Sequence, residues 1–449
     1  MSIKLRLIIL NFLEFFVWGT WMMTLAAYGF KERGWDGAEF GLVFSTMGFA
    51  SLIMPTLFGI IADKWKANYV FAFLHLLFGI TMCFLPLIGA PMPFFWVLLI
   101  AMCFYMPTIG LNNAIGFETL KKAGKDPVIH FPPIRVWGTV GFIVAMWFTN
   151  CFTKDWGFGY SIKVSFIISA VGAICLSLFA FFTLPNITKE KEENSRKVSW
   201  IDKLGLRAFV LFKQKKMAIF FIFSLMLGGA LQLTNAYGDA FLQDFHIFPK
   251  GSIVFEFSTI ILSISQISET MFILAIPFFM RRFGIKKVML MSMAAWTLRF
   301  ALFGLAGNTI LGFGLIVTSC IVYGMAFDFF NISGALFVQQ NTDSKIQSSA
   351  QGVFMLMTNG IGAVLGNLIA GYVIANFFTN KATGAIVWNL PEIPNVWFVF
   401  ASYALVVGIL FAFIFRQERT IYNNNCSHEL NPPARIVHPD HSRIPKKNT

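Results

Sequence analysis

The chain has 449 residues, of which 57% are hydrophobic and only 13% are charged, and its formal net charge is +13. Soluble globular proteins carry about 25% charged residues. So little charge cannot cover a water-facing surface of this size, which excludes a soluble enzyme, a disordered chain and a collagen-like rod. Long apolar runs that recur from end to end indicate a multi-pass membrane protein instead.

Twelve apolar segments are long enough to cross a bilayer as helices, which takes about 20 residues each. The first six cover residues 5–30, 41–62, 70–88, 94–118, 131–150 and 164–184. The second six cover residues 217–244, 254–280, 288–305, 310–339, 347–378 and 396–415. Because the runs are continuous rather than alternating, they exclude a transmembrane β-barrel. We therefore predict an all-α membrane protein.

The apolar pattern stops twice, and these breaks divide the chain into four parts. We expect an N-terminal six-helix bundle over residues 1–184, a cytoplasmic linker over 185–216, a C-terminal six-helix bundle over 217–415 and a cytoplasmic tail over 416–449. The linker contains a charge run at 189–193 and an amphipathic stretch at 200–212, for which a regulatory segment is the alternative to a plain connection. The polar tail is expected to be disordered.

The basic residues are distributed unequally between the two sides of the predicted spans. With the N-terminus placed in the cytoplasm, the inner ends and loops hold 27 of the 35 lysines and arginines, the outer loops hold six, and Arg135 and Arg299 lie within spans. This asymmetry predicts that both termini are cytoplasmic. The net charge then reflects topology and contact with anionic lipids of the bilayer, so we expect no nucleic-acid partner. The six cysteines are scattered and indicate no metal or redox site.

Two short basic loops occupy equivalent places in the two halves. The first contains Gly59, Asp63 and Lys64 and resembles the G-x-x-x-D-[RK] loop signature of the major facilitator superfamily, while residues 281–287 resemble its R-x-G-x-[RK] portion. Parallel repeats of six helices predict a substrate site near the bilayer midplane, between the halves. We expect the first loop to act in gating, and a simple solvated turn is the alternative.

Five ionisable side chains lie deep within predicted spans: Glu14, Arg135, Glu269, Arg299 and Asp328. A charge at the centre of a bilayer costs about 2.5–3.5 kcal/mol, so such residues are expected to face a cavity and to serve a function. For Arg299 we favour a structural pair away from the cavity. His75 is expected to be a packed core histidine.

Helical spacing groups polar and aromatic residues of four predicted spans into stripes. The stripes are Arg135, Thr139 and Phe142; Gln232, Asn235 and Asp239; Gln266 and Glu269; and Tyr323 and Phe327, followed by Asp328 and Asn331. Amides and aromatic rings suit a neutral, polar, partly planar solute, such as a nucleobase or a sugar. The alternative is that these residues only join helices to one another, which is also the role expected for the small residues Gly362 and Gly366.

Two carboxyl groups in these stripes, Glu269 and Asp328, are candidate proton carriers. Exposure to two different environments in turn would allow each to take up and release a proton. Glu14 is a further candidate, for which a role in helix packing or at an entrance is the alternative.

Residues 131–139, 231–235, 263–270 and 323–331 resemble the bacterial nucleoside:proton symporters, a family of the major facilitator superfamily. The resemblance runs from about residue 4 to residue 415. It implies the major facilitator fold, with two pseudo-symmetric six-helix bundles. It also implies proton-coupled uptake of purine and pyrimidine nucleosides across the bacterial inner membrane by alternating access. The implied protein is a symporter rather than an enzyme, is functional as a monomer, and uses the proton as coupling ion with no cofactor.

By position, the resemblance implies nucleoside contacts at Arg135, Thr139, Phe142, Gln232, Asn235, Gln266, Glu269, Tyr323, Phe327 and Asp328. Glu14 departs from the family pattern, in which a neutral amide is usual at this position. The alternatives are a proton-coupled sugar or oligosaccharide transporter of the same superfamily, a membrane-embedded enzyme, and a receptor that binds without transporting.

Overall fold

A computed structural model of the protein describes residues 1–154, 157–185, 206–343, 346–380, 386–388 and 395–415. Residues Met1–Gln417 form one compact unit. The predicted charge run at 189–193 and the predicted tail at 416–449 lie outside the described residues, so their roles stay predictions, as do the boundaries of the linker.

The described part of the chain before residue 186 forms a first bundle of helices. Its elements are α1 (Ile3–Met22), α2 (Leu25–Ala27), the π-helix η1 (Tyr28–Glu32), α3 (Gly37–Phe44), α4 (Thr46–Lys64), α5 (Ala67–Phe84), the 3-10 turn η2 (Leu85–Leu87), α6 (Pro91–Lys122), α7 (Pro127–His130), α8 (Pro132–Thr153) and α9 (Val164–Thr183). Within it, α1 packs against α8 and α9, while α5 packs against α6 and α9.

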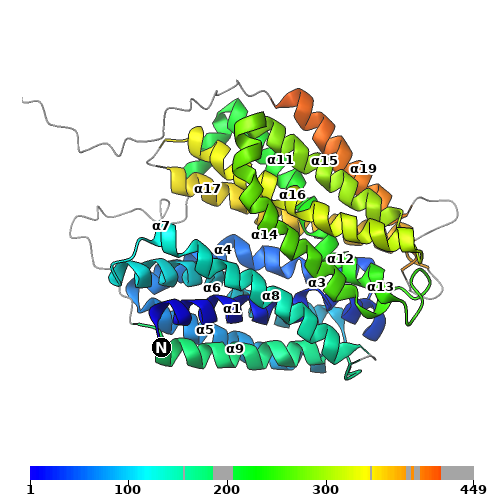
Figure 1. Ribbon diagram of the computed structural model, residues 1–449, viewed down its shortest axis with the longest axis horizontal. Coiled ribbons are helices and arrows are strands. Elements are labelled where there is room, and N and C mark those ends of the chain that lie inside the picture. The colour runs from blue at the N-terminus through cyan, green and yellow to red at the C-terminus, as the bar shows by residue number, and fades with distance from the viewer. Residues whose placement is uncertain (155–156, 186–205, 344–345, 381–385, 389–394, 416–449) are drawn as a thin grey trace, which may run out of the picture. The chain divides into compact units, whose positions relative to one another are not determined.

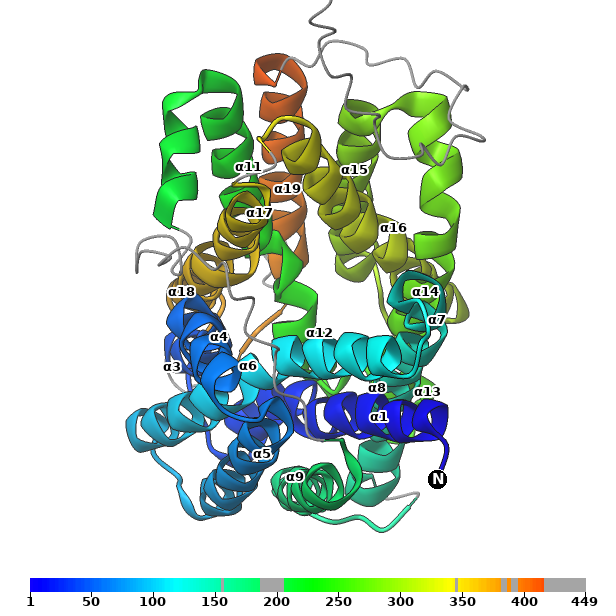
Figure 2. The ribbon, with the colours of Figure 1, turned by 90° about the vertical axis from the view of Figure 1, so that its left-hand side faces the viewer.

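The described part after residue 205 forms a second bundle. Its elements are η3 (Leu206–Lys213), α11 (Lys215–Leu231), α12 (Leu233–Leu242), α13 (Ile253–Glu256), α14 (Ser258–Phe283), α15 (Ile285–Gly304), α16 (Ile310–Gln340), α17 (Gln347–Met355), the π-helix η4 (Leu356–Gly362), α18 (Ala363–Phe377) and α19 (Val396–Ile414). Here α16 packs against α14 and α15, and α15 also packs against α19. The bundles meet where α8 contacts α14, α3 contacts α18 and α4 contacts η4 (Figures 1 and 2).

Eleven helical runs among the described residues are long and apolar enough to cross a membrane. The remaining predicted span, residues 288–305, corresponds to α15, which is 20 residues long but includes Lys286, Lys287 and Arg299. The predicted all-helical architecture is therefore confirmed. Several predicted spans are interrupted: the first consists of α1, α2 and η1, and the seventh breaks at Gln232 between α11 and α12.

A capping box and a glycine turn mark the starts of α3 and α15. Asp36 and Glu39 form a capping box at the start of α3, with Glu39 N 2.8 Å from Asp36 Oδ1 and Asp36 N 3.0 Å from Glu39 Oε2. Gly284 separates α14 from α15 at a φ of +76°, a conformation that glycine adopts without steric cost. This tight turn lies in the second of the two predicted basic loops.

Glycines allow close helix contact in the second bundle. A Cβ atom at Gly366 would lie 2.3 Å from the Cα of Gly229, and one at Gly362 would lie 2.5 Å from the carbonyl oxygen of Leu225. Side chains at these positions would force α11 away from η4 and α18. The close packing predicted for Gly362 and Gly366 is confirmed.

Lysine residues of the first bundle are concentrated at one end of its helices. At one end α4 ends, α5 begins and α6 ends, and Lys64, Lys66, Lys121 and Lys122 gather there; we call it the basic end. Arg6 donates to the carbonyl oxygen of Thr183 across 3.0 Å, which brings the start of α1 and the end of α9 to this end as well. We call the other end, where η1 and α8 finish, the Lys31 end.

Candidate functional site

Arg135 lies on the face of the first bundle that contains the predicted stripe of α8. Its guanidinium carbon lies 4.0 Å from the ring centroid of Phe15 on α1, an attractive contact between a cation and an aromatic face. Phe15 lies twelve residues beyond the start of α1, which is about 18 Å along the helix axis. Arg135 therefore lies well inside the length of α1, although it belongs to the first turn of α8.

The other two residues of this stripe extend the wall beside Arg135. Phe142 is buried, and its ring meets the ring of Trp18 edge-on at a centroid distance of 6.2 Å. Thr139 is half-buried one turn from Arg135. The first bundle thus contributes one cation, one hydroxyl and an aromatic surface.

The break between α11 and α12 positions two amides of the second bundle. Gln232 lies between the two helices, as the residue that follows α11 and precedes α12, and Asn235 Nδ2 lies 3.5 Å from Gln232 Oε1. Both side chains are half-buried, so parts of their amide groups stay accessible. The side chain of Asn235 also interacts with the Tyr323 hydroxyl.

Gln266 and Glu269 come from α14, whose backbone touches α16. A Cβ atom at Gly324 would lie 2.5 Å from the carbonyl oxygen of Ser268 and 2.7 Å from the backbone nitrogen of Glu269. Glycine at 324 therefore lets α16 approach α14 at the level of Glu269. This contact brings the predicted stripes of the two helices together.

On α16, Tyr323 is buried and its ring stacks on that of Phe327 at a centroid distance of 5.6 Å. Asp328 is 4% exposed, and its Oδ2 has no hydrogen-bond partner among the described residues. Its carboxyl group interacts electrostatically with that of Glu269, which in turn interacts with Arg135 across the two bundles. The structure thus joins Arg135, Glu269 and Asp328 into one electrostatic group.

Arg299 lies behind Tyr323 and is almost completely buried. It donates to the carbonyl oxygen of Ser319 (2.8 Å), to Thr234 Oγ1 (3.2 Å) and to Ser265 Oγ (3.4 Å). Its guanidinium carbon lies 4.5 Å from the ring centroid of Tyr323. The structure supports a structural role for Arg299 but not the predicted pair, because its partners among the described residues are hydroxyl groups, a carbonyl, the Cys320 thiol and two aromatic rings rather than an acid. Sequence spacing did not identify this support for Tyr323.

Glu14 belongs to a separate polar cluster inside the first bundle. Its Oε2 lies 3.0 Å from His75 Nε2, and both side chains are fully buried. Thr108 Oγ1 donates to Oε1 across 2.7 Å, and the Tyr105 hydroxyl donates to the Glu14 backbone carbonyl across 2.7 Å. His75 is a core residue as predicted, but it is also the ion-pair partner of Glu14.

His75 lies between two oxygen atoms of the first bundle. Its Nδ1 is 3.1 Å from the carbonyl oxygen of Phe71, and because a carbonyl only accepts, Nδ1 is the donor in this contact. Its Nε2 faces Glu14 Oε2 across the ion pair. A buried ionisable group is less costly when it has such a partner.

Asp239, which spacing grouped with Gln232 and Asn235, lies one helical turn away from Asn235 toward the Lys31 end. Ser258 Oγ and Gln243 Nε2 each donate to its carboxylate across 2.7 Å. These partners hold the carboxylate within the second bundle. Spacing along one helix gives a face but not a depth, so Asp239 is not among the residues that we assign to the site.

Two lysines of the first bundle connect it to the second bundle near Asp239. Lys154 Nζ donates to the carbonyl oxygen of Phe255 across 2.7 Å, and Lys31 Nζ donates to that of Gln243. Both ammonium groups lie within 4.7 Å of the ring centroid of Phe255. These contacts hold the bundles together at the Lys31 end.

A hydrogen bond from Trp147 Nε1 to Ser263 Oγ (2.8 Å) and one from Thr259 Oγ1 to the carbonyl oxygen of Met146 (3.2 Å) lie in the same half of the helices. The hydrogen bonds between the bundles thus gather toward the Lys31 end.

The predicted gating loop lies at the basic end. Gly59 has open space around its Cα, Lys64 is exposed, and the side chain of Asp63 lies outside the described residues. A role in gating therefore stays a prediction. Over the described ranges, no group of three or more His, Cys, Asp or Glu side chains is arranged to hold a metal ion.

Known proteins resemble this chain over most of its length. Residues 1–420 match the family described as nucleoside H+ symporter. Nucleoside permease NupG and xanthosine permease, both from Escherichia coli (strain K12), are 46% and 45% identical to this chain over 421 residues, which are 93% of this chain and 97% of each relative. A crystal structure of nucleoside transporter NupG matches with a TM-score of 0.84 at 46% identity, covering 93% of this chain and 100% of that one.

Proposed function

This chain belongs to the nucleoside H+ symporter family, and from that premise we propose that it imports nucleosides across the bacterial inner membrane through the site between its two bundles. It is a multi-pass membrane transporter with the major facilitator fold. Proton-coupled nucleoside uptake, inferred above from the resemblance, is the activity of this family, so the resemblance is confirmed. We propose in addition which residues perform this uptake, that the membrane is the inner membrane, and how the chain is oriented in it.

The observation that carries the proposal is the electrostatic interaction between Arg135 of the first bundle and the carboxyl groups of the second. Arg135 interacts with Glu269, and Glu269 interacts with Asp328. A substrate that binds between Arg135 and these carboxyl groups would contact both bundles. Its contacts would therefore change when the bundles move relative to one another. Such a position is expected for a symporter that works by alternating access.

We assign nucleoside contacts to the ten residues predicted from the sequence. The amides of Gln232, Asn235 and Gln266 provide donors and acceptors for the edge of a base or the hydroxyl groups of ribose. The half-buried ring of Phe327 offers a flat apolar face, against which a base stacks favourably, and the buried rings of Phe142 and Tyr323 belong to the walls of the proposed site. Thr139 adds a hydroxyl group beside Arg135.

Glu269 and Asp328 are the proposed proton carriers. Two carboxylates that interact in a membrane interior are costly to keep ionised together, so one proton between them is favourable. Arg135 offers Glu269 a positive partner when that proton leaves. Protonation, the position of Arg135 and nucleoside binding are thereby coupled at one site. The membrane potential supplies about 2.3 kcal/mol per charge per 100 mV for concentrative uptake.

The contacts at the Lys31 end support a conformation that is closed on that side. We propose that the basic end faces the cytoplasm, because lysine and arginine accumulate in cytoplasmic loops. Both termini would then be cytoplasmic. Nucleosides would be released through the basic end after entry from the opposite side.

Uptake of labelled uridine tests the function directly. Cells or proteoliposomes that contain the protein should accumulate uridine when a proton gradient is imposed, and a protonophore should abolish the accumulation. Unlabelled nucleosides should compete with the label, whereas disaccharides should not. Competition by disaccharides alone would favour a sugar transporter, and binding without accumulation would favour a receptor.

A further inference from the structure

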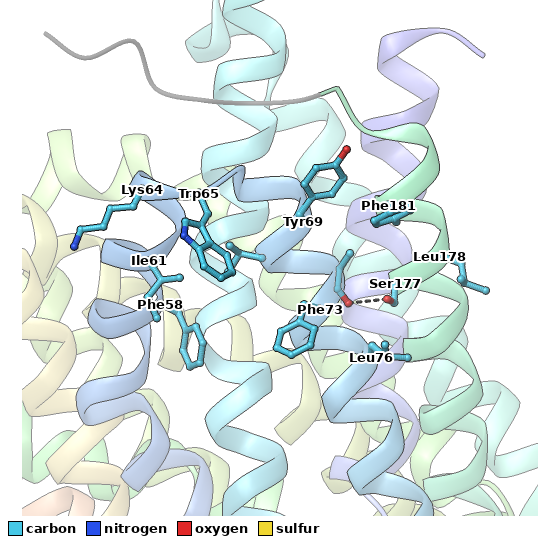
Figure 3. A pocket seen from close by; sticks show the side chains of 12 residues that line it. Phe58, Ile61, Lys64, Trp65, Tyr69, Phe73, Leu76, Ser177, Leu178 and Phe181 are labelled. Carbon is cyan, nitrogen blue, oxygen red and sulfur yellow. Dashed lines mark hydrogen bonds between the residues drawn. The ribbon is translucent and has the colours of Figure 1, made fainter.

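An open groove lies on the first bundle at the basic end, away from the proposed nucleoside site. It has a volume of about 710 Å3 and lies between α4, α5 and α9 (Figure 3). Its wall is apolar, with exposed side chains that include Phe73, Leu76, Leu178 and Phe181. The groove opens on the surface of the bundle where lipid surrounds the protein.

A hydrogen bond within the wall of the groove satisfies the hydroxyl group of Ser177. Ser177 Oγ donates to the carbonyl oxygen of Ala72 across 2.6 Å, which joins α9 to α5 (Figure 3). The hydroxyl hydrogen of Ser177 is therefore already used. This part of the groove suits a hydrocarbon chain, which needs no hydrogen bonds.

The end of the groove near the α4–α5 turn has a different chemistry. Trp65 and Tyr69 line this end, and Trp65 is 69% exposed. Tryptophan and tyrosine are enriched where the hydrocarbon of a membrane meets the headgroups. The ammonium group of Lys66 lies 5.2 Å from the ring centroid of Tyr69, and therefore at the rim of the groove.

Lys64 adds a second positive charge to this end. Its stem lines the groove, while its ammonium group points away from Trp65 in Figure 3. Because the side chain is exposed, its rotamers exchange within nanoseconds, and a change of rotamer would turn the ammonium group toward the groove. No acidic side chain is among the described residues that line the groove.

A second groove of the protein differs from the first in the charge of its lining residues. It lies between α11, α18 and α19, has a volume of about 310 Å3, and is lined by apolar side chains, glycines and Tyr403. None of its described lining residues is charged. Apolar grooves of this kind accept acyl chains of any lipid, whereas the first groove is lined by Lys64 and by two interfacial aromatic side chains, one of which, Tyr69, is contacted by Lys66.

We propose that the α4–α5–α9 groove binds one anionic phospholipid of the leaflet at the basic end. Its acyl chain lies along Phe73, Leu76 and Phe181, and its phosphate lies between Lys64 and Lys66. Attraction between lysine side chains and an anionic headgroup at a membrane surface provides the preference for negative charge. The proposal requires only that the chain spans a membrane, so it stands independently of the substrate.

Lipid binding to the purified, delipidated full-length protein tests this assignment. Native mass spectrometry with phosphatidylglycerol and phosphatidylcholine of the same acyl chains measures the preference for an anionic headgroup. The protein is expected to bind phosphatidylglycerol more tightly, on the order of tenfold for two lysines near the headgroup. Lys64→Gln with Lys66→Gln should abolish most of this preference and leave phosphatidylcholine binding unchanged.

A matched control removes the same charge elsewhere at the basic end. Lys121 and Lys125 are exposed and do not line the groove, so Lys121→Gln with Lys125→Gln should retain the preference. Leu178→Trp, which fills the apolar part, should weaken binding of both lipids at this site. Equal affinity of the unmodified protein for the two lipids would overturn the proposal. So would a preference that survives in the Lys64 and Lys66 variant, or one that falls equally in the control.

Discussion

The two bundles bury carboxyl groups in different ways. In the first bundle, Glu14 has His75 at 3.0 Å and Thr108 at 2.7 Å. In the second bundle, Asp328 is almost as deeply buried, but the charged neighbour of its carboxyl group is another acid, Glu269. A buried polar group is costly unless it is paired, so the two sites differ in what they can still bind.

This difference separates a structural role from a transport role. The ion pair of Glu14 and His75 joins α1 to α5 in the fully buried interior of the first bundle. The Glu269 and Asp328 group stands beside Arg135 and half-buried amides, where a substrate and a proton would change its partners. We therefore expect proton coupling to depend on the second bundle.

The largest effect is expected from Asp328→Asn or Glu269→Gln. Each change removes a group that takes up a proton while keeping its size, so accumulation driven by a pH gradient should be abolished and uridine should only equilibrate. Uptake into proteoliposomes with an imposed gradient measures this, and thermal unfolding in detergent checks that the variants are folded. Accumulation at the level of the unmodified protein in both variants would remove these residues from the proton pathway.

Glu14 variants test the other half of the comparison. Glu14→Leu leaves His75 buried without its partner and should destabilise the protein by about 3 kcal/mol, seen as a large drop in the temperature of thermal unfolding. Glu14→Gln can still accept from Thr108 and donate to a neutral His75, so both stability and proton-driven accumulation should persist. If folded Glu14→Gln protein fails to accumulate uridine, Glu14 takes part in proton coupling and the contrast between the bundles is lost.

Gln232→Ala and Asn235→Ala test the two half-buried amides of the second bundle. Each removes one amide that we assign to the nucleoside, and loss of a hydrogen bond of this kind costs roughly 1 kcal/mol, a several-fold weaker affinity. Calorimetric titration of purified protein with uridine provides the measurement. Unchanged affinity in both variants would place the nucleoside elsewhere.

The smallest effect is expected from Thr108→Val. This change removes one of the partners of Glu14 and should lower the free energy of unfolding by about 1 kcal/mol, while uridine affinity stays unchanged. Thermal unfolding and calorimetry on the same sample separate the two quantities. Weaker uridine binding without loss of stability would mean that the cluster in the first bundle acts on the site.

The sequence predicts some of these features because they depend on local patterns. The spans are predictable since hydropathy is summed over many residues, and the Arg135 to Phe142 stripe since a helix repeats every 3.6 residues. The partnership of Glu14 and His75 depends on which helices meet in space. A signal was nevertheless present: both are ionisable residues inside apolar spans, and each requires a partner. Arg299 is similar, because only the packing of α12, α14 and α16 reveals its position behind Tyr323.

Nucleoside-induced proton movement is the most direct test of the central claim that Glu269 and Asp328 carry the proton. Proteoliposomes loaded with a pH-sensitive dye would be mixed with uridine in the absence of an imposed gradient. The account predicts internal acidification with the unmodified protein and with Glu14→Gln, and none with Asp328→Asn. Acidification by Asp328→Asn equal to that of the unmodified protein, together with its loss in Glu14→Gln, would contradict the account.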